Sequence, residues 1–348
     1  MSFNQPYVEK RTRKGTFLKQ INQIVEWQPI EKEINKVYKR GQSVDGRQAY
    51  PGLLLFKMLL LGIWYNMSDV EVEDHVRDSL SANSFCGLQL EDDVPDHSTL
   101  SRFRTEMVAK KAFDRLLRKM NDQLKVKKLM VKTGIAMIDA TITESPRVPD
   151  ERPTYEIASD RKEDEREESE KQKEEDQMKL VRKNQPGVDE QARYLKKGKR
   201  LYFGYKKQIA VEEQGLIKAV HTSAANEHDS KGFVPLLDQL EDEELKEGAF
   251  TDKGYQVPDN VAYLKKRKVK NRIQHKAYRN RPLTEWEITF NKLISKKRYK
   301  VERTFGGMVR WFGCGHARYV GLAKTHAQHV LEAIAYNLYR LPGIIVSE

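Results

Sequence analysis

One carboxylate interrupts an otherwise apolar and β-branched run, GIAMIDATIT, at residues 134–143. From Ile135 the pattern has a period of two, which predicts a β-strand with two different faces. One face carries Ala136, Ile138, Ala140 and Ile142, and the other carries Asp139, Thr141 and Thr143. A carboxylate beside apolar surface is costly unless a cation or a metal ion lies next to it. Asp139 is therefore the first candidate functional residue.

The chain before this strand has a helical pattern from about Gln20 to Leu124. Ser68, followed three residues later by Glu71, predicts the N-cap of a helix. In VPDHSTLSRFR a turn at Asp96 precedes a helix from about Ser98, whose exposed face is expected to carry Arg102 and Arg104. This layout is typical of a helix-turn-helix, although an ordinary helical hairpin with surface arginines fits the spacing equally well.

Beyond the strand, a charged block of low complexity (150–180) lacks the apolar period of a core segment, and we expect a surface helix or a mobile insertion. Two alternating runs around the turn Glu213–Gly215 predict a hairpin, Asp229 is expected to cap the next helix, and GAFTDKGY predicts another strand. Two helices close the chain, the last one expected to stop at Pro342. The order of elements predicts a mixed α/β sheet behind a helical region.

Composition narrows the partners of this chain. It has 348 residues with 63 Lys and Arg against 51 Asp and Glu, a net charge of +12, which favours an anionic partner such as nucleic acid. Its two cysteines, Cys86 and Cys314, form no Cys-x-x-Cys pair and are expected to be buried thiols. The N-terminal residues lack the apolar run of a signal peptide, and no membrane span is expected, so we predict a cytoplasmic protein.

Two further acids border predicted apolar surface, as Asp139 does. Asp252 follows a short apolar strand, and Glu302 flanks the apolar stripe of a helix. Magnesium prefers such oxygen ligands, and three acids in a basic protein suggest two-metal phosphoryl transfer on a nucleic acid backbone. For each acid taken singly, a structural role is an equal alternative: an N-cap, a turn aspartate, or an ion pair of Glu302 with Arg298 one helical turn away.

The surroundings of these acids are basic. The stretches YLKKRKVKNRIQHKAYRNR and SKKRYK lie between Asp252 and Glu302. There we expect DNA contact, with a merely solvated face as the alternative. Lys253 fits a phosphate contact and a turn cap equally well. Trp311 and Phe312 could stack on an unpaired base, although aromatic residues on a helix more often belong to the core.

Several ordered blocks together resemble the DDE transposases of bacterial insertion sequences, specifically the insertion-sequence-five group. These blocks are VPDHSTLSRFR, IDATIT, KKGKRLYFGYKKQIAVEEQGLI, HTSAANEHDSKG, FTDKGY, VERTFGGMVRWFG and ARYVGLAKTHAQHVLEAIAYNLYRL, and they cover nearly the whole chain. The resemblance implies an all-helical helix-turn-helix domain for DNA binding and dimerisation (1–128). A ribonuclease-H-like catalytic domain would follow (129–348), with a charged insertion at about 146–199.

The resemblance also assigns residues. It implies that Asp139, Asp252 and Glu302 are the catalytic triad and the metal ligands, with two Mg²⁺ ions that Mn²⁺ could replace. The residues expected at DNA are Ser98, Arg102, Arg104, Lys253, Arg298, Arg303 and Arg310.

This chain departs from the family pattern around the last acid. Arg298 and Glu302 match, but Ser295 stands at a tyrosine position and Val309 at a lysine position, where Arg310 could substitute if Gly306 and Gly307 bend the helix. The sequence segment between Asp252 and Glu302 is too short to contain a large β insertion. Cleavage through a DNA hairpin intermediate is therefore less expected.

The predicted function is a transposase that cleaves at terminal inverted repeats of double-stranded DNA and joins the released 3′-hydroxyl to target DNA. Joining two ends needs two copies, so we expect a homodimer on DNA, at the nucleoid of the cytoplasm. Two alternatives stay open on the sequence: a DNA-binding protein without catalysis, such as an inactive transposase descendant, and a metal-dependent DNA nuclease that does not join ends.

Overall fold

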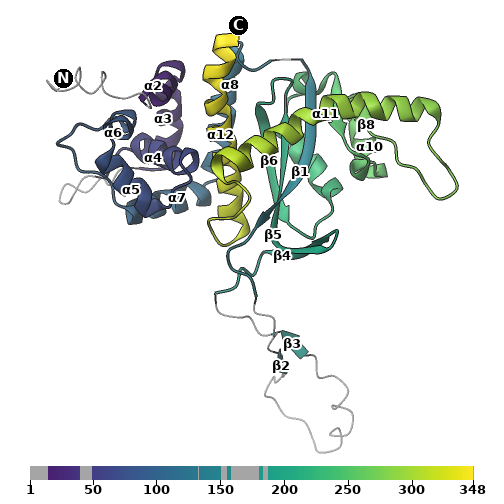
Figure 1. The fold of residues 1–348 in the computed structure, drawn as a ribbon, viewed down its shortest axis with the longest axis horizontal. Coiled ribbons are helices and arrows are strands. Elements are labelled where there is room, and N and C mark those ends of the chain that lie inside the picture. The colour runs from purple at the N-terminus through teal and green to yellow at the C-terminus, as the bar shows by residue number, and fades with distance from the viewer. Residues whose placement is uncertain are drawn as a thin grey trace, which may run out of the picture.

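A computed structural model describes residues 15–39, 49–131, 133–149, 155–157, 180–182 and 187–347 (Figure 1). The predicted helical region is confirmed and comprises seven described helices. They are α2 (Gly15–Ile24), α3 (Trp27–Asn35), α4 (Gly52–Trp64), α5 (Asp69–Asp78), α6 (Leu80–Cys86), α7 (His97–Ala109) and α8 (Ala112–Val126). Ser68 caps α5 in a capping box with Glu71, as predicted.

A mixed sheet follows, in the order β4-β5-β1-β7-β8, with β6 paired to β5. Strands β5 and β6 form the predicted hairpin, β1 pairs with β5 antiparallel, and β7 and β8 run parallel to β1. The strands are β1 (Ile135–Glu144), β4 (Arg193–Lys197), β5 (Arg200–Val211), β6 (Ile217–Ala224), β7 (Gly248–Thr251) and β8 (Asn271–Ile273). The predicted mixed α/β architecture is therefore confirmed.

Helices cover both faces of this sheet. Ala136 and Ile138 of β1 belong to a core with α9 (Phe233–Leu237) and α10 (Pro258–Lys266), whereas Met137 belongs to a core with α11 (Glu285–Phe312) and α12 (Leu322–Ser347). This division follows the predicted alternation along β1. Short 3₁₀ turns complete this half, at η2 (Asp229–Gly232), η3 (Asp242–Leu245) and η4 (Lys253–Tyr255).

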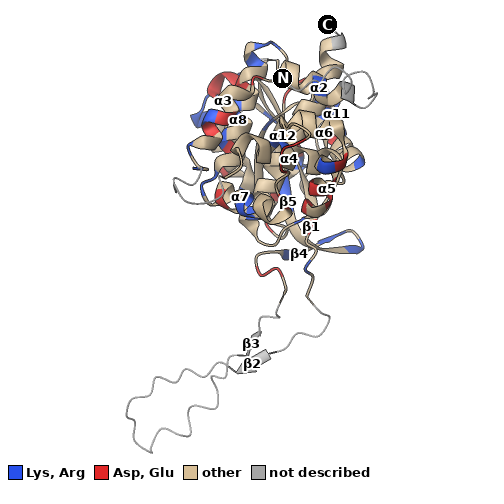
Figure 2. Ribbon diagram, turned by 90° about the vertical axis from the view of Figure 1, so that its left-hand side faces the viewer, with Lys and Arg blue, Asp and Glu red and all other residues tan. Residues whose placement is uncertain are grey.

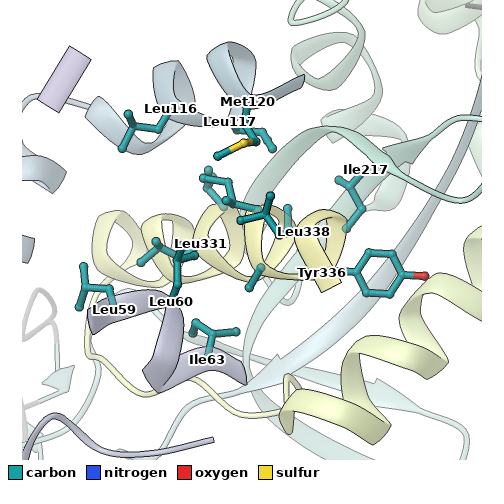
Figure 3. Close-up of a cluster of buried hydrophobic side chains, with 14 of the residues drawn as sticks. Leu59, Leu60, Ile63, Leu116, Leu117, Met120, Ile217, Leu331, Tyr336 and Leu338 are labelled. Atoms are coloured by element: carbon teal, nitrogen blue, oxygen red, sulfur yellow. The ribbon is translucent and has the colours of Figure 1, made fainter. Parts of the chain in front are cut away.

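The last helix joins the two halves of the chain. Leucines of α12 pack between Leu60 of α4 and Leu117 of α8, and Ile217 of β6 lies in the same cluster (Figure 3). One apolar core therefore continues across residue 128. The division into two domains describes the order of elements and stays a prediction.

One sequence expectation for the last helix differs from the structure. Pro342 does not stop the last helix, because α12 continues to Ser347 and Ile344 is buried in the core, which offsets the hydrogen bond that proline cannot make. Within the predicted charged insertion at about 146–199, β4 is an edge strand and Asp189 and Ala192 are buried, and the bounds of the insertion stay a prediction. Most of block 150–180 lies outside the described residues, apart from the paired segments β2 (Tyr155–Ile157) and β3 (Leu180–Arg182).

Within the described ranges, no single helix has the length and apolarity to cross a membrane. The pair α4 and α5 meets that criterion only when taken together, across a bend of 104°.

Candidate active site

Asp139 and Asp252 come from adjacent parallel strands. Met137 of β1 pairs with Phe250 of β7, so two residues further along each strand the same register brings Asp139 beside Asp252. Asp252 directly follows β7 and lies at its carboxyl end, the edge where α/β sheets usually bind ligands. The structure thus brings two of the three predicted acids together.

Glu302 comes from α11, which packs on the face of β1 that carries Asp139. Val301, Phe305 and Met308 anchor this helix in the core, and Glu302 lies on the exposed flank of that stripe, as predicted. Burial, and then the charges of Asp252 and Glu302, raise the pKa of Asp139, against the opposing effect of Arg298. Asp252 and Glu302 therefore both lie within electrostatic reach of Asp139.

Both oxygens of Asp139 already accept hydrogen bonds or ion pairs. Oδ1 accepts from the backbone N–H of Ala140 at 2.9 Å, and Oδ2 lies 3.1 Å from Nη2 of Arg298. Among the described residues, Arg298 forms its ion pair with Asp139 and not with Glu302 one helical turn away. Arg298 is 7% exposed, and its Nε has no described partner.

Asp252 also has a structural role. Its Oδ1 accepts from the N–H of Gly254 at 2.8 Å and caps η4, which is the turn role that the sequence left open. Lys253 therefore does not cap this turn, and its side chain is exposed. One oxygen of Asp252 holds the turn, and the other has no hydrogen bond in the described part of the chain.

Two residues near the acids were missed or misassigned from the sequence. Tyr255 is fully buried, its hydroxyl has no described partner, and burial together with Asp229, Asp139 and Asp252 raises its pKa well above the ordinary value. Asp229 does not cap the next helix. His228 accepts from the N–H of Ser230 instead, and Asp229 pairs with Lys206 at 2.6 Å. The one sequence signal for Tyr255 was its position three residues after Asp252 in the segment DKGY.

The expected DNA contacts separate into exposed and buried residues. Arg303 and Arg310 of α11 are exposed, and α11 continues as one helix across Gly306 and Gly307. Arg104 is buried, contrary to expectation. It pairs with Asp69 at 2.5 Å, and its guanidinium lies 4.2 Å from the ring centroid of Tyr319. The helical spacing missed this role because neither partner is on α7.

The surface around the predicted helix-turn-helix is acidic. Ser98 and Arg102 are exposed at the start of α7, where Asp96 is the N-cap. Residues 66–97 contain nine Asp and Glu against one Arg, a formal charge of −8, and Figure 2 shows red segments on α5. This charge opposes a DNA backbone near Ser98. The helix-turn-helix role of α7 stays a prediction.

The two aromatic residues at the end of α11 differ. Phe312 is buried, as the core interpretation expected, whereas Trp311 is 41% exposed and stacks on Tyr336 with ring centroids 6.0 Å apart. Cys86 and Cys314 are buried thiols, as predicted.

A divalent cation matches the chemistry of these three carboxylates but not their present placement. Hard cations favour carboxylate oxygens, and the polar atoms left without partners, Tyr255 Oη and Arg298 Nε, lie beside the same acids. As they stand, however, no three His, Cys, Asp or Glu side chains in the described ranges gather closely enough to hold an ion. The side chain of Arg298 occupies the cationic position next to Asp139.

Comparison with known proteins identifies the family to which this chain is similar. The family model described as "Transposase DDE domain" matches residues 133–338, which include all three acids, and the model described as "Transposase domain (DUF772)" matches residues 6–106. A transposase for the insertion sequence element IS1106 of Neisseria meningitidis serogroup B is 33% identical over 242 residues, 69% of this chain and 76% of that protein. No solved structure matches the chain significantly.

Proposed function

Because this chain belongs to the transposase DDE domain family, we propose that it cleaves DNA at the terminal inverted repeats of its insertion sequence and transfers the strand to target DNA. The observation that carries the proposal is the convergence of Asp139 and Asp252 at one sheet edge, with Glu302 on α11 near enough for its charge to raise the pKa of Asp139. The mixed sheet behind a helical region fits the ribonuclease-H-like fold of this family. Membership of the insertion-sequence-five group stays a prediction.

Asp139, Asp252 and Glu302 would hold the divalent cation, Mg²⁺ with Mn²⁺ as a substitute. A bound divalent cation supplies a nucleophilic oxygen at neutral pH and stabilises charge on the reacting phosphate. The fold contributes the positions of these acids along the backbone: β1 carries Asp139, Asp252 directly follows β7, and the buried stripe of α11 leaves Glu302 on its exposed flank. The chemistry needs no covalent bond to the protein, so we assign no Ser, Cys or Tyr nucleophile.

DNA would approach along the basic segment beside the acids. Residues 264–300 carry fourteen Lys and Arg against two Glu. Lys253, Arg303 and Arg310 extend this charge as exposed side chains close in sequence to the acids. Such contacts hold the backbone without reading sequence. Two copies would be needed to join two ends, so we expect a homodimer on DNA, and the DNA substrate places the protein at the bacterial nucleoid.

The test uses purified full-length protein, Mg²⁺ and labelled DNA that carries the ends of its own element. Wild type is expected to nick and join this DNA, whereas Asp139→Asn, Asp252→Asn and Glu302→Gln bind the ends without cutting. Asparagine keeps the cap to Gly254, so Asp252→Asn is expected to retain the fold. Glu285→Gln, at the exposed start of α11, is the matched control and is expected to keep activity.

Each other outcome selects a different function. Binding without cleavage by wild type would indicate a DNA-binding protein, and cleavage without joining would indicate a nuclease. Cleavage by any of the three acid variants at the wild-type rate would refute the assigned triad.

A further inference from the structure

We propose that a cavity outside the carboxylate site binds a small uncharged aromatic molecule, and that His221 of β6 forms a hydrogen bond to this ligand. The cavity has a volume of about 660 Å³ and lies where α7, α8, β6 and α12 meet. Sites for small molecules commonly have volumes of about 300–1,000 Å³. The inference goes beyond the proposed function, because it involves neither the three acids nor DNA.

The walls of the cavity are mainly apolar. Val108 of α7, Phe113 of α8, and Leu322 and Ala327 of α12 all line it. Figure 3 shows α8, α12 and β6 packed together in the core that this wall adjoins. An apolar wall that includes the ring of Phe113 favours the flat apolar body of another aromatic ring.

Three polar residues of the wall already bind one another. Nε2 of His326 lies 2.9 Å from Oδ1 of Asp114, and its Nδ1 lies 3.0 Å from Oγ1 of Thr222. The same hydroxyl lies 2.8 Å from Nδ1 of His329, which is fully buried behind the wall. Both ring nitrogens of His326 and the hydroxyl of Thr222 therefore have partners within the protein, and we assign them no contact with the ligand.

His221 and Gln191 line the cavity and retain hydrogen-bonding capacity. Among the described residues, neither ring nitrogen of His221 has a partner, and the side-chain amide of Gln191 uses only its oxygen, which accepts from the N–H of Leu322 at 2.7 Å. Burial, and then the neighbouring His326, lower the pKa of His221, against the opposing charge of Glu227. A neutral imidazole donates through one nitrogen and accepts through the other, so it matches a hydroxyl or ring N–H of the ligand.

The charges of the wall favour a ligand without charge. In the described part of the chain, Lys111 is the one Lys or Arg that lines the cavity and Asp114 is the one Asp or Glu, so their formal charges cancel. Lys111 is exposed to water, and Asp114 is bound to His326. An ionic ligand would lose water against an apolar wall without gaining a dedicated counter-charge, which disfavours its binding.

The experiment uses the full chain without DNA and three probes that share one ring system. These are 2-naphthylmethanol, which is uncharged, 2-naphthoate, an anion, and 2-naphthylmethylamine, a cation at neutral pH. Ligand-observed NMR titrations measure the dissociation constant of each probe. We expect about 0.1–1 mM for 2-naphthylmethanol, as fits a probe of this size. Each charged probe is expected to bind at least about threefold more weakly.

Two substitutions on α12 locate the bound probe. Ala323 lines the cavity and is exposed, so Ala323→Phe would place a ring inside it. This variant should bind 2-naphthylmethanol at least about tenfold more weakly, because the two rings compete for one space. Lys324→Phe adds the same ring at the next residue, which is exposed and outside the cavity lining, and should bind like wild type. Thermal unfolding of each variant establishes that it is folded.

His221→Phe tests the hydrogen bond and does not depend on Ala323→Phe. It keeps a ring at this position but removes both nitrogens, so 2-naphthylmethanol should bind about fivefold more weakly. The pairing of β6 with β5 uses backbone groups, so we expect this variant to fold.

Four results would each overturn the inference. They are the absence of binding of every probe to wild type up to about 2 mM, tighter binding of a charged probe than of 2-naphthylmethanol, equal affinity of Ala323→Phe and Lys324→Phe, and an unchanged dissociation constant in His221→Phe. All four leave the proposed function standing, because the measurement contains neither DNA nor a metal ion. A failure of DNA cleavage would likewise leave this site unaffected.

Discussion

Lys207 of β5 and Glu332 of α12 form a buried ion pair, with 2.5 Å between Nζ and Oε2 and 1% of each side chain exposed. Gln328 donates to the second oxygen of Glu332 at 2.7 Å, so the pair is well satisfied. It fastens the closing helix to the strand next to β1. The position of α12 on the sheet therefore depends on a contact between two charges that water does not reach.

Removing one charge of this pair should be strongly destabilising. We expect Lys207→Met to lower the free energy of unfolding by about 3–5 kcal/mol, because Glu332 would stay buried without a counter-charge. The double variant with Glu332→Leu should recover most of that loss. Urea unfolding of the three variants measures both effects, and a loss below about 1 kcal/mol in Lys207→Met would contradict the account.

The buried side chain of Lys57 should make the free energy of unfolding depend on pH. Its Nζ donates to Asn22 at 3.0 Å and to the carbonyl of Phe85 at 2.9 Å, and burial lowers its pKa from 10.5 to about 8. The unfolded chain then binds more protons between these pH values. The free energy of unfolding should therefore rise with pH in this window, by up to about 3 kcal/mol from this residue.

The control for this prediction is Lys57→Met, which should lose that rise while other lysines titrate as before. Thermal unfolding of both proteins between pH 7.5 and 10 provides the difference. Parallel stability curves would show that Lys57 stays protonated in the folded protein.

Arg104 and Arg102 should respond differently to truncation. Arg104→Ala removes the buried partner of Asp69 and the contact with Tyr319, and we expect a loss of about 3 kcal/mol in stability. Arg102→Ala is expected to change stability by less than about 0.5 kcal/mol, because its side chain is exposed.

DNA affinity provides a second test of the exposed Arg102. If α7 contacts DNA, Arg102→Ala lowers affinity and reduces the slope of log affinity against log salt concentration by about 1. An unchanged slope would favour the helical hairpin for α7, in keeping with its acidic surroundings.

The basic segment 264–300 predicts how DNA affinity depends on salt concentration. Lys292 and Lys296 are exposed on α11. If both contact phosphates, Lys292→Gln with Lys296→Gln should lower the salt slope of DNA binding by about 2. Neutralising Lys119, exposed on α8, is the comparison and should leave the slope nearly unchanged. Equal effects at both places would mean that the segment is only a solvated face.

Local patterns predicted several elements of this protein well. The period of two from Ile135, the capping box at Ser68 and the turn before Gly215 all correspond to observed elements, because each depends on residues within a few positions. The same local information failed where distant partners decide. Arg104 was expected to be exposed, and its burial depends on Tyr319, which only folding brings near.

The sequence by itself determined the alternating faces of β1, the lone acid on one of them and the order of the main helices and strands, but not the short strands β4 and β8. These follow from side-chain periodicity, which the backbone imposes along the chain. Only the tertiary structure decided that Arg298 pairs with Asp139 instead of Glu302, one helical turn away. The physical reason is burial: the face of α11 that packs on β1 turns Arg298 inward, where the carboxylate of Asp139 is the counter-charge that compensates for lost water.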